Sequence, residues 1–311
     1  LVFHRQVIEN NTSKSIIKTL SHEIKFLESY PFNKYNSLRW TFSLRRDKDV
    51  FMATDWYNLN TTDNIRNWGG IKMEYVFDNT KSPTLNIYYG SRYKVFAEYY
   101  KQLKKYKGND IAIVGIDFRK YTKISRTIIL ANRIAASTSA FASDKLIYYL
   151  GGVDTWLAPK FNKSVDVDPS QNYAYQTLAT NMRGFEQNIR NGTNFALINN
   201  EIRFPIVKYF AQHPIKSDFF SNLQIITFMD AGVAWTGKSP YDEDNTFFKT
   251  TYYAKPLKIT VKTQKEPIVF GYGLGLRTKI LGYFLRADWA WGIEDKTIQP
   301  MIFYLSLSLD F

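Results

Sequence analysis

The sequence predicts an all-β protein, and within that class an antiparallel transmembrane β-barrel. Apolar and polar residues alternate in runs of about ten residues, the length that a tilted strand needs to cross a bilayer. Tight turns alternate with long polar loops along the 311 residues. Aromatic residues make up 17% of the chain, which exceeds what one core requires, and aromatic rings are enriched where a membrane meets water.

The alternation is clear from residue 38 onward. Leu38, Trp40, Phe42 and Leu44 fall on one face of residues 38–45, and arginine, threonine and serine fall on the other. Similar runs follow at 71–77, 111–120, 285–291 and 303–311. We expect about twelve strands from residue 38, and about fourteen if residues 1–10 and 15–28 contribute. In a membrane barrel the apolar face points to lipid and the charged face lines the lumen.

A soluble β-sandwich or a lipocalin-like barrel also alternates, with its apolar face inward. The strand length and the asymmetry of the loops favour the membrane barrel instead. Aromatics also crowd the expected strand ends, as at Tyr88-Tyr89 and Tyr148-Tyr149, where a barrel meets the membrane surface. No run of about eighteen apolar residues occurs, so no transmembrane helix is expected.

The composition argues against a metal, a cofactor, an enzyme and a nucleic-acid partner. Cysteine is absent, and the three histidines are scattered without ligand spacing. The sequence has neither a nucleophile elbow nor a phosphate-cradling glycine loop. The net charge of +13 would suit a nucleic acid. However, rings and arginines alternate onto opposite faces, whereas a stacking platform needs both on one surface. We expect the excess charge in the lumen, in loops and beside anionic lipid headgroups.

We expect a single domain over residues 1–311, because no linker rich in proline, glycine or serine divides the chain. Residues 1–37 are expected to add strands of uncertain register. The chain opens within a strand-like pattern and without Met, so we expect a longer protein whose N-terminal domain is absent from this chain. Residues 158–193 are the longest stretch without periodicity, and loops of that length are usually functional.

Four motifs follow one another from the end of that loop. The loop ends in Arg183-Gly184-Phe185; the next strand carries Asn199, Glu201 and Arg203 inward; Phe228, Asp230 and Gly232 share an inner face; and so do Gly271, Gly273, Gly275 and Arg277. Inward glycines in consecutive pleats remove side chains and clear a slot. An arginine that enters this slot on a loop is expected to pair with an inward carboxylate, Asp230 or Glu201.

Each motif alone is more often a turn than a site, but their joint occurrence in phase with the pleat indicates a site. We call one group the lumen lock: Arg183, Gly184, Phe185, Asp230 and Glu201. We call the other the glycine slot: Phe228, Gly232, Gly271, Gly273, Gly275 and Arg277.

This order of motifs resembles the outer-membrane assembly-factor and surface-antigen superfamily, which includes the barrel-assembly insertase and the two-partner-secretion transporters. The shared features are the Arg-Gly-aromatic loop, the F-x-D-x-G strand, the G-x-G-x-R strand and a terminal strand ending in Asp310-Phe311, all within residues 182–311. Residues 38–157 are similar to a branch in which such barrels follow a periplasmic β-propeller.

The resemblance implies the C-terminal part of a sixteen-stranded barrel, with the loop at 158–193 folded into the lumen and Arg183 anchored on Asp230. It implies that Phe311 ends a β-signal whose lipid-facing partners are Leu307 and Leu309. Ser308 departs from the family, in which a glycine is common there. The implied location is the outer membrane of a Gram-negative bacterium, and the implied role is insertion of outer-membrane proteins or translocation of polypeptide.

The implied partners are outer-membrane lipids including lipopolysaccharide, client or secreted polypeptides, a periplasmic domain and accessory lipoproteins. An alternative of a different class is a passive channel, or a structural anchor for a periplasmic propeller or a surface complex.

Overall fold

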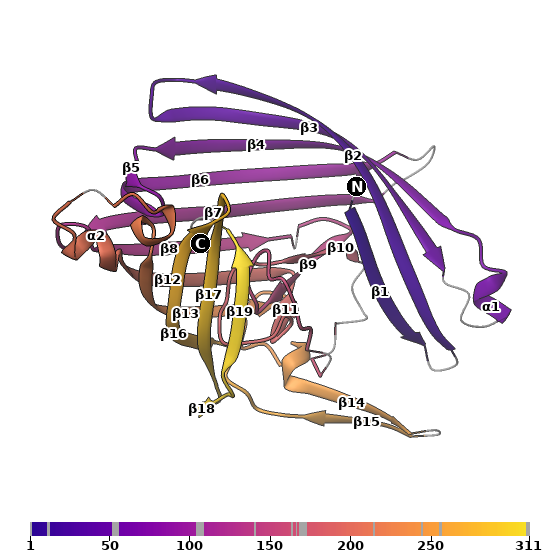
Figure 1. Ribbon diagram of the computed structural model, residues 1–311. Helices are drawn as coiled ribbons and strands as arrows, with labels where there is room; N and C mark the ends of the chain where they lie inside the picture. Colours follow the sequence, from indigo (N-terminus) through magenta and orange to yellow (C-terminus); the bar gives the residue numbers. More distant parts are fainter. Residues whose placement is uncertain are drawn as a thin grey trace.

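The computed structural model describes residues 2–10, 13–51, 56–103, 109–139, 141–162, 164–165, 167, 173–213, 215–243, 245–254 and 257–308. Its main element is a 14-stranded antiparallel sheet (Figure 1). The strands along the sheet are β1 (Val2–Asn10), β2 (Ser13–Pro31), β3 (Asn36–Phe51), β4 (Asn64–Asp78), β6 (Ile87–Gln102), β7 (Asp110–Lys123), β8 (Ile129–Thr138), β12 (Asn194–Phe204), β13 (Gln224–Trp235), β16 (Val269–Ile280), β17 (Tyr283–Glu294) and β18 (Thr297–Ile298). In addition, β5 (Lys81–Thr84) pairs with β6, and β19 (Ile302–Leu307) pairs with β17. The predicted all-β antiparallel class is confirmed.

The sheet is curved and open. In Figure 1 it bends from β2 and β3 round to β17 and β19, so that one face is concave. Within the described ranges, no pairing joins β1 to β19. The closed barrel that the resemblance implies is therefore not complete in this structure. Residues 1–37, whose register the sequence left uncertain, supply β1, β2 and the start of β3, and β2 pairs with β3 from Ile17↔Phe51 to Pro31↔Ser37.

Apolar side chains cover the convex face of the sheet. Its concave side carries the polar side chains and, beside the insert, buried apolar side chains such as Ile113 and Leu197. On β3, Phe42 and Leu44 are exposed, at 47% and 61%, while Thr41 and Ser43 between the apolar positions are buried. On β7, Asp117 is likewise buried between exposed apolar neighbours. Successive side chains of a strand point to opposite faces. The faces are therefore arranged as in the predicted membrane barrel, and the concave side corresponds to the lumen.

The connections divide the sheet into a turn end and a loop end. At the turn end, β16 and β17 are joined by Leu281 and Gly282 alone, whose φ angles are 51° and 86°. Positive φ at both positions is the pattern of a two-residue hairpin turn that matches the twist of the strands. The tight turn predicted within residues 279–283 is confirmed.

At the loop end, the polar loop predicted over residues 236–248 extends further than expected. It leads through a 3-10 helix, η1 (Thr246–Phe248), into a hairpin of β14 (Lys249–Ala254) and β15 (Leu257–Lys262), which projects away from the sheet in Figure 1. Three short helices lie in connections: α1 (Trp56–Leu59), α2 (Ile206–Phe210) and α3 (Asp218–Ser221). In the described part of the chain, no helix has the length and apolar character to cross a membrane.

Residues 139–193, which we call the insert, leave the sheet between β8 and β12. These two strands nevertheless pair directly, from Thr138↔Asn194 to Ile129↔Arg203. The insert contains β9 (Lys145–Leu150), β10 (Tyr173–Leu178) and β11 (Arg190–Gly192), which form a three-stranded sheet with β9 in the middle. In Figure 1 this small sheet lies on the concave side of the large one.

The structure of the insert differs from the prediction in two respects. The loop predicted over residues 158–193 begins earlier and contains strands, which pair with the distant β9 and therefore show no local alternation. Tyr148 and Tyr149, expected at a membrane interface, instead lie buried in β9. The Tyr148 hydroxyl lies 2.7 Å from the Ser137 hydroxyl, and its ring packs edge-on against Phe195 of the wall. Burial raises the pKa of Tyr148 to about 12.

Candidate functional site

Arg183 of the insert is buried against the inner faces of β12 and β13. Its Nε and Nη2 donate to the two carboxylate oxygens of Asp230, each at 2.7 Å, and its backbone N–H donates to Oδ2 at 3.1 Å. The side chain of Asn199 adds a hydrogen bond of 2.8 Å to Oδ1. This two-pronged geometry is the one in which a guanidinium matches a carboxylate best. The sequence left two carboxylates as candidates, and Asp230 makes the bidentate contact.

Glu201 also binds Arg183. Its Oε1 accepts a hydrogen bond from Nη1 of Arg183, and its Oε2 accepts one of 2.9 Å from Nε of Arg203. The ring of Phe228 lies 3.7 Å from the guanidinium carbon of Arg183, a cation–π contact. All these side chains are at most 3% exposed. Buried charges are stable only when they are paired, and Arg183 supplies the cation that pairs with Asp230.

Gly184 and Phe185 complete the docking of the insert. Gly184 has φ +95°, and a Cβ on it would lie 2.7 Å from backbone atoms of Trp291 and Gly292, so only glycine fits. The Gly184 N–H donates to the Tyr304 hydroxyl at 3.0 Å, and that hydroxyl donates to the backbone oxygen of Phe185 at 2.7 Å. Tyr304 and Gly292 were missed in the sequence, where a tyrosine or glycine on an inner face gives no distinguishing signal.

Removing the Tyr304 hydroxyl should weaken the docking measurably. We expect Tyr304→Phe to lower the free energy of unfolding by about 1–3 kcal/mol, because it leaves the buried Gly184 N–H and Phe185 oxygen without their shared partner. Equilibrium unfolding in denaturant measures the change. The matched control is Tyr272→Phe, on the outer face of β16 and stacked on Trp291, which should shift stability by less than about 0.5 kcal/mol. Equal effects of the two variants would contradict the assigned role.

The glycine slot receives a different group at each position. A Cβ on Gly271 would overlap the backbone oxygen of Arg183, so this glycine makes room for the insert itself. A Cβ on Gly273 would overlap the backbone oxygen of Trp289 and lie 2.6 Å from the ring of Phe228. We expected all the inward glycines of β16 to make room for the loop. The structure corrects this: at Gly273 the space is taken by backbone and side-chain atoms of the wall.

Two further glycines of the slot also face side chains. Gly275 lies beside Arg277 and Asp288, and Gly232 lies beside apolar side chains of β9 and β12. Nη2 of Arg277 is 2.7 Å from Oδ1 of Asp288, and Arg286 approaches the other oxygen at 3.8 Å. The buried charges of this region are those of Arg183, Arg203, Arg277 and Arg286 against Glu201, Asp230 and Asp288. Positive charge is already in excess by one, so the loss of any one carboxylate leaves a second uncompensated cation.

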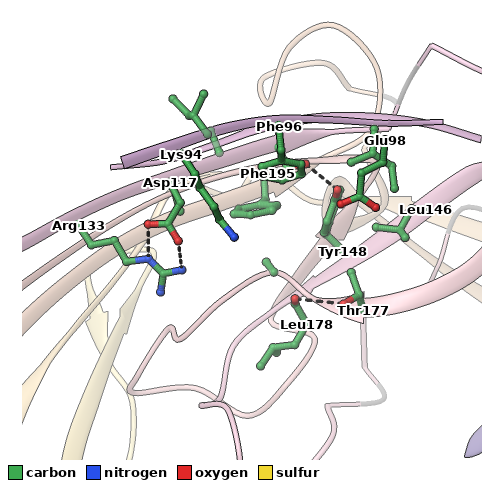
Figure 2. Close-up of a pocket in the computed structure, with 16 residues that line it drawn as sticks. Lys94, Phe96, Glu98, Asp117, Arg133, Leu146, Tyr148, Thr177, Leu178 and Phe195 are labelled. Carbon is green, nitrogen blue, oxygen red and sulfur yellow. Dashed lines mark hydrogen bonds and ion pairs between the residues drawn. The ribbon is translucent and has the colours of Figure 1, made fainter. Parts of the chain in front are cut away.

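Arg133 of β8 provides a second anchor for the insert. It makes two hydrogen bonds of 3.2 and 2.8 Å to Asp117 of β7, and its Nη1 donates to the Thr180 hydroxyl at 2.6 Å. Next to this anchor, a crevice of about 290 Å³ separates the insert from β6, β7 and β8 (Figure 2). Lys94, Glu98 and aromatic rings line it, so its surface is both charged and apolar.

The last described strand also contacts the insert. The Leu157 N–H donates to the Leu305 oxygen at 3.0 Å, and the Thr155 hydroxyl donates to the Leu307 oxygen at 2.7 Å. The Leu307 side chain is 37% exposed, on the outer face. Leu309 and Phe311 of the expected β-signal lie outside the described residues. In the part of the chain that is described, no group of three or more acidic or histidine side chains could hold a metal ion.

Comparison with known proteins finds matches among solved structures only. The sequence matches no family model and no curated protein. CdiB from Escherichia coli is 12% identical with a TM-score of 0.52, over 98% of this chain and 48% of that one. CdiB from Acinetobacter baumannii is 13% identical with a TM-score of 0.51, over 98% and 45%. BamA from Haemophilus ducreyi lacking POTRA domains 1-3 is 13% identical with a TM-score of 0.48, over 98% and 58%.

The chain is thus an antiparallel membrane-type barrel wall that holds its own insert by a buried arginine. The likeness to the two CdiB structures shows that the chain shares their fold. The comparisons give no support to the β-propeller branch. The chain spans about half the length of the CdiB structures that it matches.

Proposed function

We propose that this chain is the barrel of a bacterial outer-membrane protein that inserts other barrel proteins into that membrane or translocates polypeptide across it, and that it is not an enzyme. The observation that carries the proposal is the insert, which Arg183 holds inside the lumen by contacts with Asp230 and Glu201. An apolar convex face and a charged concave face suit lipid outside and water inside. A wide passage for polypeptide must be closed at rest, and the insert supplies the closure.

The chemistry of the lumen lock suits a closure that opens. Arg183, Asp230 and Glu201 regain hydration when water enters the lumen, and this offsets much of the interaction that they lose. The insert also packs on the wall through an apolar cluster that joins Leu150, Met182 and Phe185 to Leu197 and Val269. Release of the insert therefore also exposes apolar surface to water.

The proposal assigns a partner to each surface. Lipids, including lipopolysaccharide, contact the convex face, and client or secreted polypeptides use the lumen or the seam of the sheet. A periplasmic domain and accessory lipoproteins would deliver those polypeptides. Because the chain spans about half of each CdiB structure, these partners belong to the proposal for the whole protein.

Planar-bilayer conductance tests the closure. We expect the wild type to conduct little and Arg183→Ala to show larger or more frequent openings, because the variant removes every side-chain bond of Arg183 to the wall. The matched control is Arg45→Ala, which breaks a wall ion pair with Asp47 on β3 and should leave the openings unchanged. Identical openings in wild type and Arg183→Ala would contradict the proposal and favour the passive channel. Depletion of the protein with normal levels of outer-membrane barrels and of secreted polypeptides would contradict the insertion and translocation role.

A further inference from the structure

The connection between β4 and β6 folds inward at the turn end. Residues 79–90, which we call the turn hairpin, contain β5, and Leu85 and Asn86 form the tip. Asn86 has φ 60°, a left-handed conformation that asparagine tolerates better than most residues. Its side chain is 2% exposed. A buried polar tip needs hydrogen-bond partners, and they come from strands that are not its neighbours in the sheet.

The partners of the tip lie on β12 and β13. Nη1 of Arg203 donates to both the backbone and the side-chain oxygen of Asn86, each at 3.1 Å. The Asn86 amide donates to the Gln224 side-chain oxygen at 3.1 Å, and the Gln224 amide donates to the Leu85 oxygen at 2.8 Å. In the sheet, β7 and β8 separate β6 from β12. These bonds therefore span the concave face and do not follow the wall.

Arg203 also belongs to the lumen lock environment, because it shares Glu201 with Arg183. One carboxylate oxygen of Glu201 accepts from Arg183 and the other accepts from Arg203 at 2.9 Å. Arg203 thus divides its guanidinium between Glu201, which faces the insert, and Asn86, which belongs to the turn hairpin. Arg203 is 0% exposed, so water does not separate these contacts.

We propose that Arg203 is a positioning residue that couples the turn hairpin to the lumen lock. Nε and Nη2 of Arg203 both lie 2.9 Å from the same oxygen of Glu201, Oε2. When Arg183 leaves, the other oxygen becomes free, and Glu201 can turn until Nε and Nη2 each meet their own oxygen, as in the pair of Arg183 with Asp230. The guanidinium shifts with this turn, and the shift weakens the bonds of Nη1 to Asn86. Release of the insert at one end of the lumen thereby loosens the turn hairpin at the other. The inference rests on the proposed function of the insert as a closure, and it adds a second closure that opens with the first.

Thiol labelling tests the coupling, because the chain contains no cysteine of its own. Ile87→Cys reports on the turn hairpin and Met182→Cys on the insert, and both positions are at most 2% exposed. The full-length protein in detergent is labelled with a small polar maleimide, and the rates are compared with and without a second substitution. We expect Arg183→Gln to raise the Ile87→Cys rate at least about fivefold, the lower end of a typical coupling.

The coupling must also act in reverse, because linkage between two equilibria is reciprocal. Arg203→Gln should raise the Met182→Cys rate by a similar factor. If this variant fails to fold, Arg203→Lys is used instead, because it keeps a cation beside Glu201 but lacks the planar guanidinium. In Arg203→Lys the Ile87→Cys position should label faster, and adding Arg183→Gln should not raise that rate further. The control is Arg45→Gln, which should change neither rate.

An Arg183→Gln variant that speeds labelling of Met182→Cys but not of Ile87→Cys would overturn the coupling. The same result would leave the proposed closure intact, since the insert would still be released. Conversely, linked labelling rates combined with unaltered conductance of Arg183→Ala would contradict the proposed function and support the coupling alone.

Discussion

Asp230→Ala is expected to lower the free energy of unfolding by about 3–5 kcal/mol, the cost of breaking a buried ion pair from one side. The variant leaves the guanidinium and backbone N–H of Arg183 without their carboxylate, and it leaves the Asn199 amide without one of its acceptors. Glu201 alone then faces Arg183 and Arg203. Equilibrium unfolding in denaturant gives the loss directly.

Two variants check the origin of that loss. The double variant Asp230→Ala with Arg183→Ala should lose less than the sum of the single variants, by about 0.5–3 kcal/mol, because the groups are in direct contact. Asp218→Ala removes the carboxylate of an exposed pair with Lys279 at the turn end and should cost less than about 1 kcal/mol. A loss from Asp230→Ala no larger than that from Asp218→Ala would contradict the assigned pairing.

Gly271→Ala is expected to prevent the insert from seating while the wall stays intact. A single methyl group at this position overlaps the backbone oxygen of Arg183, and a backbone atom cannot rotate away as a side chain can. We expect a stability loss of about 3 kcal/mol, the upper end of the usual range for overpacking. Faster proteolysis within the insert and larger bilayer openings should accompany it.

The control for this variant is Gly69→Ala. Gly69 lies within β4, and an added Cβ there would meet the Leu103 side chain at 3.5 Å, an ordinary contact. The two substitutions make the same chemical change in strands of the same sheet, so the difference between them isolates the contact with the insert. Normal seating of the insert in Gly271→Ala would show that the backbone near Arg183 can shift, and would remove the steric argument for the glycine.

The alternation of residue types predicted most of the wall and the central contact of the site. A strand presents successive side chains to opposite faces, so the inward positions of Glu201, Asp230 and Gly271 follow from their spacing alone. A buried arginine requires a carboxylate, and Asp230 and Glu201 lie on the inner faces of the two strands that follow the loop. The ion pair between Arg183 and Asp230 could therefore be predicted from the sequence.

The strands inside the insert could not be predicted from the sequence. The strands β10 and β11 both pair with β9, although long connections separate them from it in the sequence. Successive residues of β9 and β11 are buried, so no exposed face produces an alternation in these strands. Tyr148 illustrates the consequence: an aromatic pair near a strand end is a frequent membrane-interface signal, and here the ring is enclosed by the insert and Phe195. Tyr304 was missed because only the docked insert brings it a partner.

The residues that hold the tip of the insert all come later in the chain than the tip itself. Glu201, Asp230, Gly271, Gly292 and Tyr304 lie on β12, β13, β16, β17 and β19. Because the partners of Arg183, Gly184 and Phe185 come from five strands that follow the insert, these residues can make all of their contacts only once those strands have taken their places in the sheet.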